Sequence, residues 1–259
     1  MIDALFNATS GLRTEQTLID VISNNVANIN TAGFKKSQVT FADATYHDAV
    51  VDTVKPEDSK PDHLVGGGTQ IASTHAEFTA GDVEVTNNQL DLAINGDGFL
   101  EVTDATGQTL YTRAGHLTLD KNGYLETADG SRLTSNIQIP ADTTKITITA
   151  TGQVQAQVAG ANQPVSVGQL QLARFMNMDG LKPMGNNAYQ ATQESGEAMF
   201  AKPGEEGMGT LQQGYMEMSN VDMAEEMTNL VVAQRAYQLN ARVIQAADQV
   251  LDTINNLRR

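Results

Sequence analysis

The sequence predicts a mixed fold in which α-helical ends flank a mainly β centre. Two patterns predict it. Near both ends, apolar residues recur at alternating steps of three and four, which is the spacing of one face of a helix. Between the ends, apolar and polar residues alternate in short runs separated by turn sequences, which is typical of antiparallel strands. The chain of 259 residues is long enough for one or two domains.

The first predicted helix lies within residues 1–33. Its apolar stripe is interrupted only by Glu15 and consists of Leu5, Ala8, Leu12, Glu15, Ile19, Ile22, Val26 and Ile29. The stripe stops at Asn30-Thr31-Ala32-Gly33, where Gly33 can adopt the left-handed conformation that ends a helix. A stripe with this heptad-like spacing keeps one helix face against a partner, so we expect this helix to pack against another.

The second predicted helix lies within residues 219–259. Asp222 and Glu225 fit a capping box at its start. Gln234 interrupts its stripe, and a buried polar residue at such a position can set the register of a coiled coil. The stripe consists of Met223, Met227, Leu230, Gln234, Tyr237, Ala241, Ile244, Leu251 and Ile254.

Seven short segments between the helices alternate apolar and polar residues and predict an antiparallel β-domain. They are residues 83–85, 90–92, 117–119, 137–139, 146–148, 154–158 and 170–172. Turn sequences separate them: Asn95-Gly96-Asp97-Gly98, Asn122-Gly123, Asp129-Gly130 and Asn186-Asn187. We expect Gly96-Asp97-Gly98 to form a hairpin turn rather than a nucleotide-binding loop, because no helical period follows it.

The composition argues against several classes of protein. The chain has 16 basic and 31 acidic residues, a net charge of −15, which disfavours binding to nucleic acid or to an anionic membrane surface. It has no cysteine, which excludes disulfides and thiolate metal sites. No run of about 18 apolar residues occurs, so we expect no membrane insertion. The acidic start lacks the pattern of a cleavable signal peptide, so we expect any export to use another route.

The sequence points to no catalytic, cofactor-binding or metal-binding residue. His47, His63, His75 and His116 show no metal-ligand spacing, and we expect them to be solvated surface residues. Gly66-Gly67-Gly68 lacks the Lys-Ser or Lys-Thr of a phosphate-binding loop. We therefore expect that the protein is not an enzyme.

Both helices carry apolar residues outside their stripes, including Leu18, Val21, Val231 and Val243. One alternative is a helical hairpin that closes a domain within one chain. The other is packing against further copies, which we favour because a two-helix pair buries only one stripe of each helix. Each exposed Ile, Val or Leu forgoes roughly 1.5–3 kcal/mol of burial. Surfaces that match head to tail without closing a ring form helical filaments.

Three groups of motifs resemble one known family, the rod and hook proteins of the bacterial flagellum. Residues 22–35, Ile22-Ser23-Asn24-Asn25-Val26-Ala27-Asn28-Ile29-Asn30-Thr31-Ala32-Gly33-Phe34-Lys35, are similar to the N-terminal signature of the family. Ser219-Asn220-Val221-Asp222 and Gln234-Arg235-Ala236-Tyr237-Gln238-Leu239-Asn240 are similar to its C-terminal signature. Residues 92–99 and Tyr111-Thr112-Arg113-Ala114-Gly115 resemble the start of its β-domain.

The resemblance implies a three-part architecture. Residues 1–33 and 219–259 would pair as a helical coiled-coil domain around a central export channel. Residues 34–85 and 190–218 would form an extended connecting region, and residues 86–189 an outward-facing β-rich domain. The motif residues carried over are Ser23, Asn24, Asn25, Asn28, Gly33, Phe34, Gln234, Arg235 and Asn240. The asparagines would either cross-link backbones where helices pack closely or cap helix ends.

The resemblance also implies a structural subunit of the flagellar basal body that forms a rigid tubular drive shaft. Among family members the chain is most similar to those of the distal rod, because of its length, its Gln234-Arg235-Ala236-Tyr237 motif and an extra segment at about residues 44–71, which stiffens the rod. A proximal rod protein or a short hook protein is the nearest alternative. A secreted oligomeric β-domain that acts as an adhesin or binds glycan is the second.

The implied partners are copies of this chain, other rod proteins, the hook protein, the P and L rings and the flagellar type III export apparatus. The implied location is the rod that crosses the periplasm, reached without cleavage of a signal peptide. We expect the contacts between subunits to be made by Leu5, Leu12, Ile19, Ile22, Val26, Ile29, Met227, Leu230, Tyr237, Ile244, Leu251 and Ile254.

Overall fold

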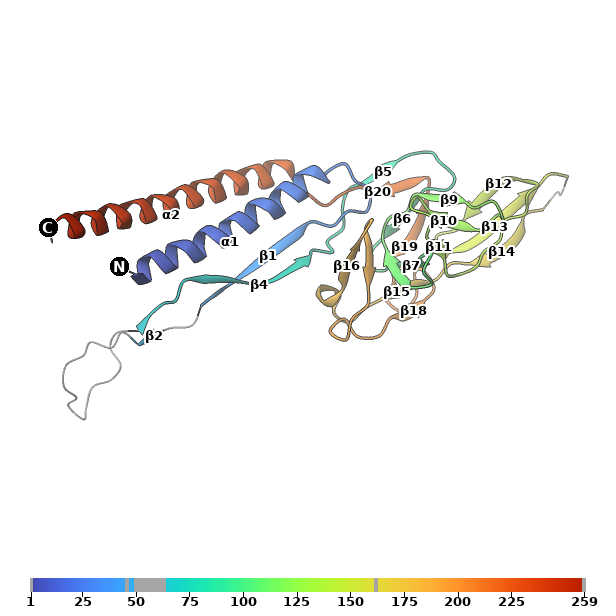
Figure 1. Ribbon diagram of the computed structural model, residues 1–259. Coiled ribbons are helices and arrows are strands. Elements are labelled where there is room, and N and C mark those ends of the chain that lie inside the picture. The colour runs from blue at the N-terminus through green and yellow to red at the C-terminus, as the bar shows by residue number, and fades with distance from the viewer. Residues whose placement is uncertain (1, 45–46, 49–63, 161–162, 258–259) are drawn as a thin grey trace. The chain divides into compact units, whose positions relative to one another are not determined.

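A computed structural model describes residues 2–44, 47–48, 64–160 and 163–257 (Figure 1). The chain forms two compact units, each assembled from separated parts of the sequence. Unit 1 comprises Met1–Val26, Ser37–Thr74 and Asp222–Arg259. Unit 2 comprises Ala27–Lys36 and His75–Val221. The predicted combination of two terminal helices and a central antiparallel β region is confirmed.

The helices are α1 (Ile2–Ala27) and α2 (Met223–Leu257), with a short 3-10 helix, η1 (Met178–Gly180). The first strands are β1 (Ser37–Asp43), β2 (His47–Asp48), β3 (Leu64–Val65), β4 (Thr69–Ala76), β5 (Val83–Val85), β6 (Leu92–Asn95), β7 (Leu100–Thr103), β8 (Thr109–Thr112), β9 (Leu117–Leu119) and β10 (Leu125–Thr127). The later strands are β11 (Arg132–Leu133), β12 (Thr143–Ile148), β13 (Gln153–Val158), β14 (Val165–Gln169), β15 (Leu172–Arg174), β16 (Lys182–Gly185), β17 (Ala188–Gln190), β18 (Met199–Ala201), β19 (Thr210–Gln213) and β20 (Tyr215–Glu217).

Unit 1 places α1 between α2 and the β1–β4 ribbon (Figure 1). On the ribbon side, the Asn7 amide donates to the Gly66 carbonyl and the Ser10 hydroxyl accepts from the Thr69 amide. The short strands β2 and β3 pair with each other. Residues 45–46 and 49–63 of the expected stiffening segment, residues 44–71, lie outside the described residues.

The start of α2 agrees with the sequence, whereas the end of α1 does not. Asp222 caps α2, since its Oδ1 accepts from the amides of Ala224 and Glu225 at 2.7 and 3.2 Å. The expectation that the first helix continues to Gly33 is wrong, because α1 ends at Ala27 and Ile29 lies in the turn that follows. The chain turns back early enough for Ser37 to hydrogen bond with Asn25. Gly33 is left-handed as expected, with φ +69°.

Unit 2 is built on an antiparallel seven-stranded sheet in the order β16-β17-β8-β7-β11-β10-β9. A three-stranded sheet, β12-β13-β14, and the pairs β19–β6, β15–β18 and β20–β5 complete it. The main core is aliphatic and includes Leu92, Ile94, Leu117, Val154 and Leu211. A second core cluster is largely aromatic, with Phe99, Tyr111, Phe175 and Tyr189 in edge-to-face contacts.

Three predicted turns are confirmed as hairpins. Asn122-Gly123 joins β9 to β10, Asp129-Gly130 joins β10 to β11, and Asn186-Asn187 joins β16 to β17. Both asparagines of the third turn have positive φ, 51° and 56°, as a type I′ turn requires. The hairpin expected at Gly96-Asp97-Gly98 is wrong, because β6 pairs with β19 and β7 pairs with β8 and β11.

Three predicted strands differ from the structure, and the first is residues 90–92, of which only Leu92 belongs to a strand, β6. Residues 137–139 form only one bridge, between Gln138 and Tyr124, although Ile137 and Ile139 are buried. Residues 170–172 lie where β14 ends and β15 begins, and these two strands belong to different sheets. In residues 137–139 and 170–172, the alternation of apolar and polar residues indicates which side chains enter the core. The backbone pairing depends instead on strands that are distant in the sequence.

Candidate functional site

The two helices of unit 1 approach each other closely at Gly11. A Cβ at this position would lie 2.7 Å from Nδ2 of Asn240, so only glycine fits without displacing that side chain. Asn240 is one of the motif residues of the C-terminal signature. This contact between α1 and α2 therefore uses a small residue and an amide rather than two large apolar side chains.

A second contact between α1 and α2 centres on Asn25, which is buried. Its Oδ1 accepts from the Ser37 amide at 2.9 Å, and its Nδ2 donates to the Ser37 carbonyl at 3.0 Å. The same Nδ2 lies 3.4 Å from Oε2 of Glu226, which is also buried. Asn25 thus holds the start of β1 and the first turn of α2 against α1.

The residues expected to pack between subunits differ in exposure. Ile22 is buried, and Leu5, Leu12, Ile19, Val26 and Ile29 are half-buried. On α2, Leu230 and Ile244 are half-buried, whereas Met227, Tyr237, Leu251 and Ile254 are exposed. Val231, Val232, Leu239, Val243 and Val250 of α2 are exposed as well. A single chain therefore leaves a long apolar surface on α2 open to solvent.

The remaining motif residues near the helices have mostly local roles. Asn28 accepts a hydrogen bond from the Thr31 hydroxyl at 3.1 Å in the turn after α1, and Phe34 donates its amide to the Thr31 carbonyl. The Ser23 hydroxyl bonds back to Ile19 within α1. Three further motif residues, Asn24, Gln234 and Arg235, are exposed.

A groove of about 620 Å³ runs between α1 and β4 within unit 1. Its lining includes the apolar side chains of Leu5, Phe6 and Ile71 beside the polar Arg13. Phe6 of this lining is 62% exposed. The groove adds to the apolar surface that unit 1 leaves uncovered.

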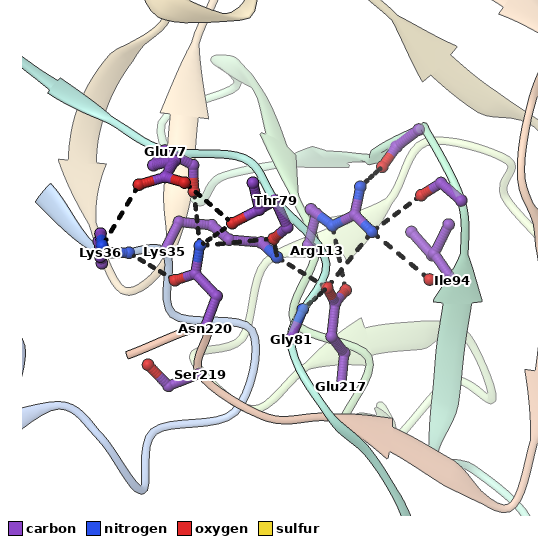
Figure 2. Close-up of polar contacts among 12 residues, drawn as sticks. Lys35, Lys36, Glu77, Thr79, Gly81, Ile94, Arg113, Glu217, Ser219 and Asn220 are labelled. Atoms are coloured by element: carbon purple, nitrogen blue, oxygen red, sulfur yellow. Dashed lines mark hydrogen bonds and ion pairs between the residues drawn. The ribbon is translucent and has the colours of Figure 1, made fainter. Parts of the chain in front are cut away.

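Unit 2 contains a buried ion cluster of Lys35, Arg113 and Glu217 (Figure 2). Lys35 Nζ lies 2.7 Å from Glu217 Oε1, and Arg113 Nε lies 3.0 Å from Glu217 Oε2. The three side chains are 0–2% exposed. Lys35 follows α1, Arg113 follows β8, and Glu217 ends β20, so the cluster joins three distant parts of the chain.

Backbone groups complete the ion cluster. Lys35 Nζ also donates to the Thr79 carbonyl at 2.6 Å, and the Gly81 amide donates to Glu217 Oε1 at 3.1 Å. The Arg113 guanidinium donates to the carbonyls of Gly98 and Gly96 at 3.1 and 2.9 Å. The cluster contains two cations and one anion, and these carbonyl oxygens compensate the excess positive charge. Arg113 thus also holds the Gly96-Asp97-Gly98 loop between β6 and β7.

The charge states in the cluster follow from burial and from its neighbours. Burial alone raises the pKa of Glu217, but the Arg113 and Lys35 cations and the hydrogen bonds from Lys35 and Gly81 lower it below the ordinary carboxyl value. Burial lowers the pKa of Lys35, and the attraction of Glu217 opposes this effect. Glu217 is therefore held as a carboxylate, the form that both cations require.

Asn220 of the C-terminal signature bonds in unit 2 to Lys36, the residue that directly follows the N-terminal signature (Figure 2). Its Oδ1 accepts from the Lys36 amide at 2.8 Å, and its Nδ2 donates to the Glu77 carbonyl and the Thr79 hydroxyl, both at 2.8 Å. The Gly33 amide donates to the Glu217 carbonyl at 2.8 Å. A Cβ on Gly33 would lie 2.8 Å from the backbone of Ala114. Residues 33–36 and 217–220 are thus joined by both backbone and side-chain contacts.

Sequence reasoning did not identify this cluster. Lys35 and Arg113 lie inside the quoted motifs, but no partner was assigned to them, and Glu217 lies outside every motif. A usable signal was Glu217 itself, a single acid between Met216 and Met218 in an alternating segment. His116 is exposed, as expected, and its Nδ1 lies 2.7 Å from Oδ1 of Asp91.

Neither a cluster of metal ligands nor a membrane-spanning helix is found in the described part of the chain. Within residues 2–44, 47–48, 64–160 and 163–257, three or more histidine, aspartate or glutamate side chains nowhere gather as metal ligands would. In the same residues, neither helix has the length and apolarity needed to cross a membrane.

Comparison with protein families matches three parts of the chain. Residues 5–35 match the flagella basal body rod protein family, residues 93–156 the flagellar hook protein FlgE/F/G D1 domain, and residues 212–257 the flagellar basal body rod FlgEFG protein C-terminal domain. The first range contains Asn25 and Lys35, and the third contains Glu217 and Asn240. The second contains Arg113.

Comparison with characterised proteins gives full-length matches. The chain is 40% identical over 268 residues to the flagellar basal-body rod protein FlgG of Borreliella burgdorferi, with 100% of both chains covered. It is 41% identical over 263 residues to FlgG of Caulobacter vibrioides, covering 99% of this chain and 100% of the relative. It is 38% identical over 269 residues to FlgG of Bacillus subtilis, with 100% of both covered.

These relatives favour the rod over the hook and adhesin alternatives. Their similarity extends over both terminal helices and the whole β region, so it cannot come from one shared module. The predicted family, and within it the predicted distal rod type, are confirmed. The chain therefore belongs to the flagellar basal-body rod protein family and is a structural rod subunit.

Proposed function

We propose that copies of this chain polymerise into the distal part of the flagellar rod, a rigid tube that transmits torque from the motor to the hook and surrounds the export channel. The observation that carries this proposal is the apolar surface of α2 that one chain leaves exposed, with Val232 at 61% and Leu239 at 60%. At roughly 1.5–3 kcal/mol for each buried Val or Leu, such a surface favours association. Further copies of the same chain supply the matching surface.

In the proposed tube, residues 1–33 and 219–259 pair as a coiled coil and form the inner wall. Residues 34–85 and 190–218 form the connecting region, and residues 86–189 face outward. The exposed and half-buried members of the expected packing set then line contacts between subunits, whereas Ile22 packs within its own chain. Torque passes along the tube without unwinding it, because closely packed side chains between subunits resist deformation.

The protein acts by packing rather than by catalysis, and it needs no cofactor. Its partners are other rod proteins, the hook protein and the P and L rings around the rod. It reaches the periplasm through the flagellar type III apparatus, without cleavage of a signal peptide. A net charge of −15 disfavours a role at nucleic acid or at an anionic membrane.

Export through a narrow channel requires a chain that can be threaded. We propose that α1 and α2 are disordered in the isolated subunit and fold when copies assemble. Hydrogen exchange on dilute monomer tests this step. Rapid exchange of the amides of α1 and α2, beside protected amides in the seven-stranded sheet, supports it. Protected helices in the monomer contradict it.

Assembly itself is tested by electron microscopy of the concentrated full chain, which should form straight tubes. Leu251→Asp introduces a charge into the exposed apolar surface of α2 and should abolish the tubes. Gln249→Asp adds the same charge two residues away, at an exposed polar position, and should leave them. Tubes of Leu251→Asp that match those of the natural chain contradict the proposal.

A further inference from the structure

The α2 helix carries two apolar lines, one on each side of the face that contacts α1. Line A consists of Met223, Met227, Leu230, Gln234, Tyr237 and Ala241. Line B consists of Val232, Ala236, Leu239, Val243, Ala246 and Val250. Glu226 and Asn240, which touch α1, lie between them. At about 100° per residue, the centres of the two lines lie roughly 80–100° to either side of that contact face.

The two lines have the same spacing. In each, the steps from one residue to the next are four, three, four, three and four. The whole line spans 18 residues, which is about five turns at 3.6 residues per turn, so it runs straight along the helix for about 27 Å. Two straight helices can therefore place one line against the other over its full length without supercoiling.

Neither line is covered within one chain. Val232, Leu239, Val243 and Val250 of line B are exposed, and so are Met223, Met227 and Tyr237 of line A. Gln234 is the one polar member of the twelve. The contact with α1 thus leaves two further contact lines available on the same helix.

We propose that line A of one copy packs against line B of the next copy, with the two α2 helices parallel and each residue facing the residue nine positions later in its neighbour. This inference rests on the proposed polymerisation and adds its orientation and register. The shift of nine pairs large side chains with small ones: Met227 with Ala236, Tyr237 with Ala246, and Val250 with Ala241. Such interdigitation is what close packing requires.

The parallel direction follows from the symmetry of a tube. Copies related by rotation about the tube axis and translation along it all point the same way. Because line A and line B are different surfaces, the contact is heterologous, and each copy can bind one neighbour on each side.

Asp248 selects the register. It continues line A one heptad beyond Ala241, and it is exposed in the single chain. A shift of two residues would place it against Val250, and a shift of minus five would place it against Val243. Either arrangement would bury a carboxylate without a partner, which is strongly unfavourable. A shift of nine places Asp248 level with Leu257, the last residue of α2, at the very end of the contact.

A shift of nine residues displaces the next copy by about 14 Å along the helix axis, at 1.5 Å per residue. Contacts with such a displacement cannot close into a flat ring. They continue as an open helix, which is the symmetry of a filament.

Cysteine cross-linking tests the register, since the natural chain has no cysteine. Full-length Tyr237→Cys and Ala246→Cys chains are mixed, assembled, checked for polymer by sedimentation and then oxidised. A disulfide forms only where the two Cβ atoms come within about 4.5 Å. We expect several-fold more cross-linked dimer in this mixture than in two control mixtures. Tyr237→Cys with Leu239→Cys reports a shift of two residues, and Tyr237→Cys with Ala236→Cys reports antiparallel helices.

A second mixture, Met227→Cys with Ala236→Cys, reports the same register if the Tyr237 substitution impairs assembly. Polymer that yields no cross-link in either expected mixture, or more in a control mixture, overturns the register and leaves the proposed function intact. A natural chain that never polymerises, even with both helices formed, contradicts the proposed function instead.

Discussion

Lys35 and Glu217 form a buried ion pair, with 2.7 Å between Nζ and Oε1, that joins the segment after α1 to the strand before α2. Arg113 occupies the other carboxylate oxygen, so Glu217 is shared between two cations. Removing one partner of a buried pair costs far more than an exposed pair contributes, because the remaining charge stays desolvated. The stability of unit 2 should therefore depend strongly on this one carboxylate.

Glu217→Gln should destabilise unit 2 by about 3–5 kcal/mol, since it leaves Lys35 and Arg113 without their anion. Urea unfolding followed by a probe in the seven-stranded sheet measures the loss. Glu84→Gln makes the same change at an exposed position on β5 and should stay within about 0.5 kcal/mol of the natural chain. Equal effects of the two substitutions would show that the ion cluster does not stabilise unit 2.

Acid should weaken unit 2 through the same residue. The folded-state pKa of Glu217 lies below the ordinary carboxyl value of 4.5, so the unfolded chain binds a proton more readily than the folded one. The stability that Glu217 contributes is complete above about pH 4.5 and is lost as the pH falls through the lowered pKa. Unfolding free energies measured against pH should slope less steeply in Glu217→Gln. Parallel slopes would contradict this assignment.

Gly33→Ala should be costly for two reasons that a control separates. The residue has φ +69°, and its Cβ would meet the backbone of Ala114 at 2.8 Å. Gly130→Ala has a similar φ of +84° but no atom within 4 Å of its Cβ. We expect Gly130→Ala to cost about 1–2 kcal/mol from backbone strain alone. Gly33→Ala should cost about 1–3 kcal/mol more from overpacking, as measured by urea unfolding.

Asn25→Ala should release the start of β1 from α1. It removes both side-chain hydrogen bonds to Ser37, each worth about 1 kcal/mol, and leaves buried polar groups unpaired. Amide exchange at Ser37 in assembled protein should become faster. Asn25→Asp keeps the acceptor for the Ser37 amide but loses the donor and adds a charge beside Glu226, so it should not restore protection. Unchanged exchange in Asn25→Ala would rule out this role.

Ile22→Asp should abolish rod assembly while unit 2 stays folded. Ile22 is 3% exposed on α1, so the substitution buries a charge without a partner. Ser23→Asp adds the same charge at the next, exposed position and should permit assembly. Motility of cells that carry each variant, together with the unfolding curve of unit 2, separates the outcomes. Normal motility with Ile22→Asp would count against packing through α1.

Local signals in the sequence were sufficient for the start of α2 and for most hairpins. The period of α2, its cap at Asp222 and the Asn-Gly turn before β10 each depend on residues close together in the chain. The end of α1 was missed because Asn25 requires Ser37 to return to it, which is a contact rather than a propensity. Residues 137–139 were misassigned because burial of Ile137 and Ile139 alternates without an adjoining strand.

The ion cluster could not be predicted because its members lie far apart in the sequence. Lys35 and Glu217 are 182 positions apart, and Arg113 and Glu217 are 104 apart. A charged residue in a motif indicates importance but not its partner. The exposed stripe of α2 could be recognised from spacing alone, whereas the small contact of Gly11 with Asn240 could not, since neither residue belongs to an apolar pattern.

The position of Glu217 has a consequence for the order in which this molecule is completed. Unit 2 is assembled from two separated parts of the chain. Glu217, the anion of its ion cluster, is the last residue of β20, the strand that precedes α2. A polypeptide delivered from its N-terminus therefore waits with Lys35 and Arg113 unneutralised until β20 emerges. Folding of unit 2 can therefore be completed only after nearly the entire chain has been delivered, shortly before α2 follows.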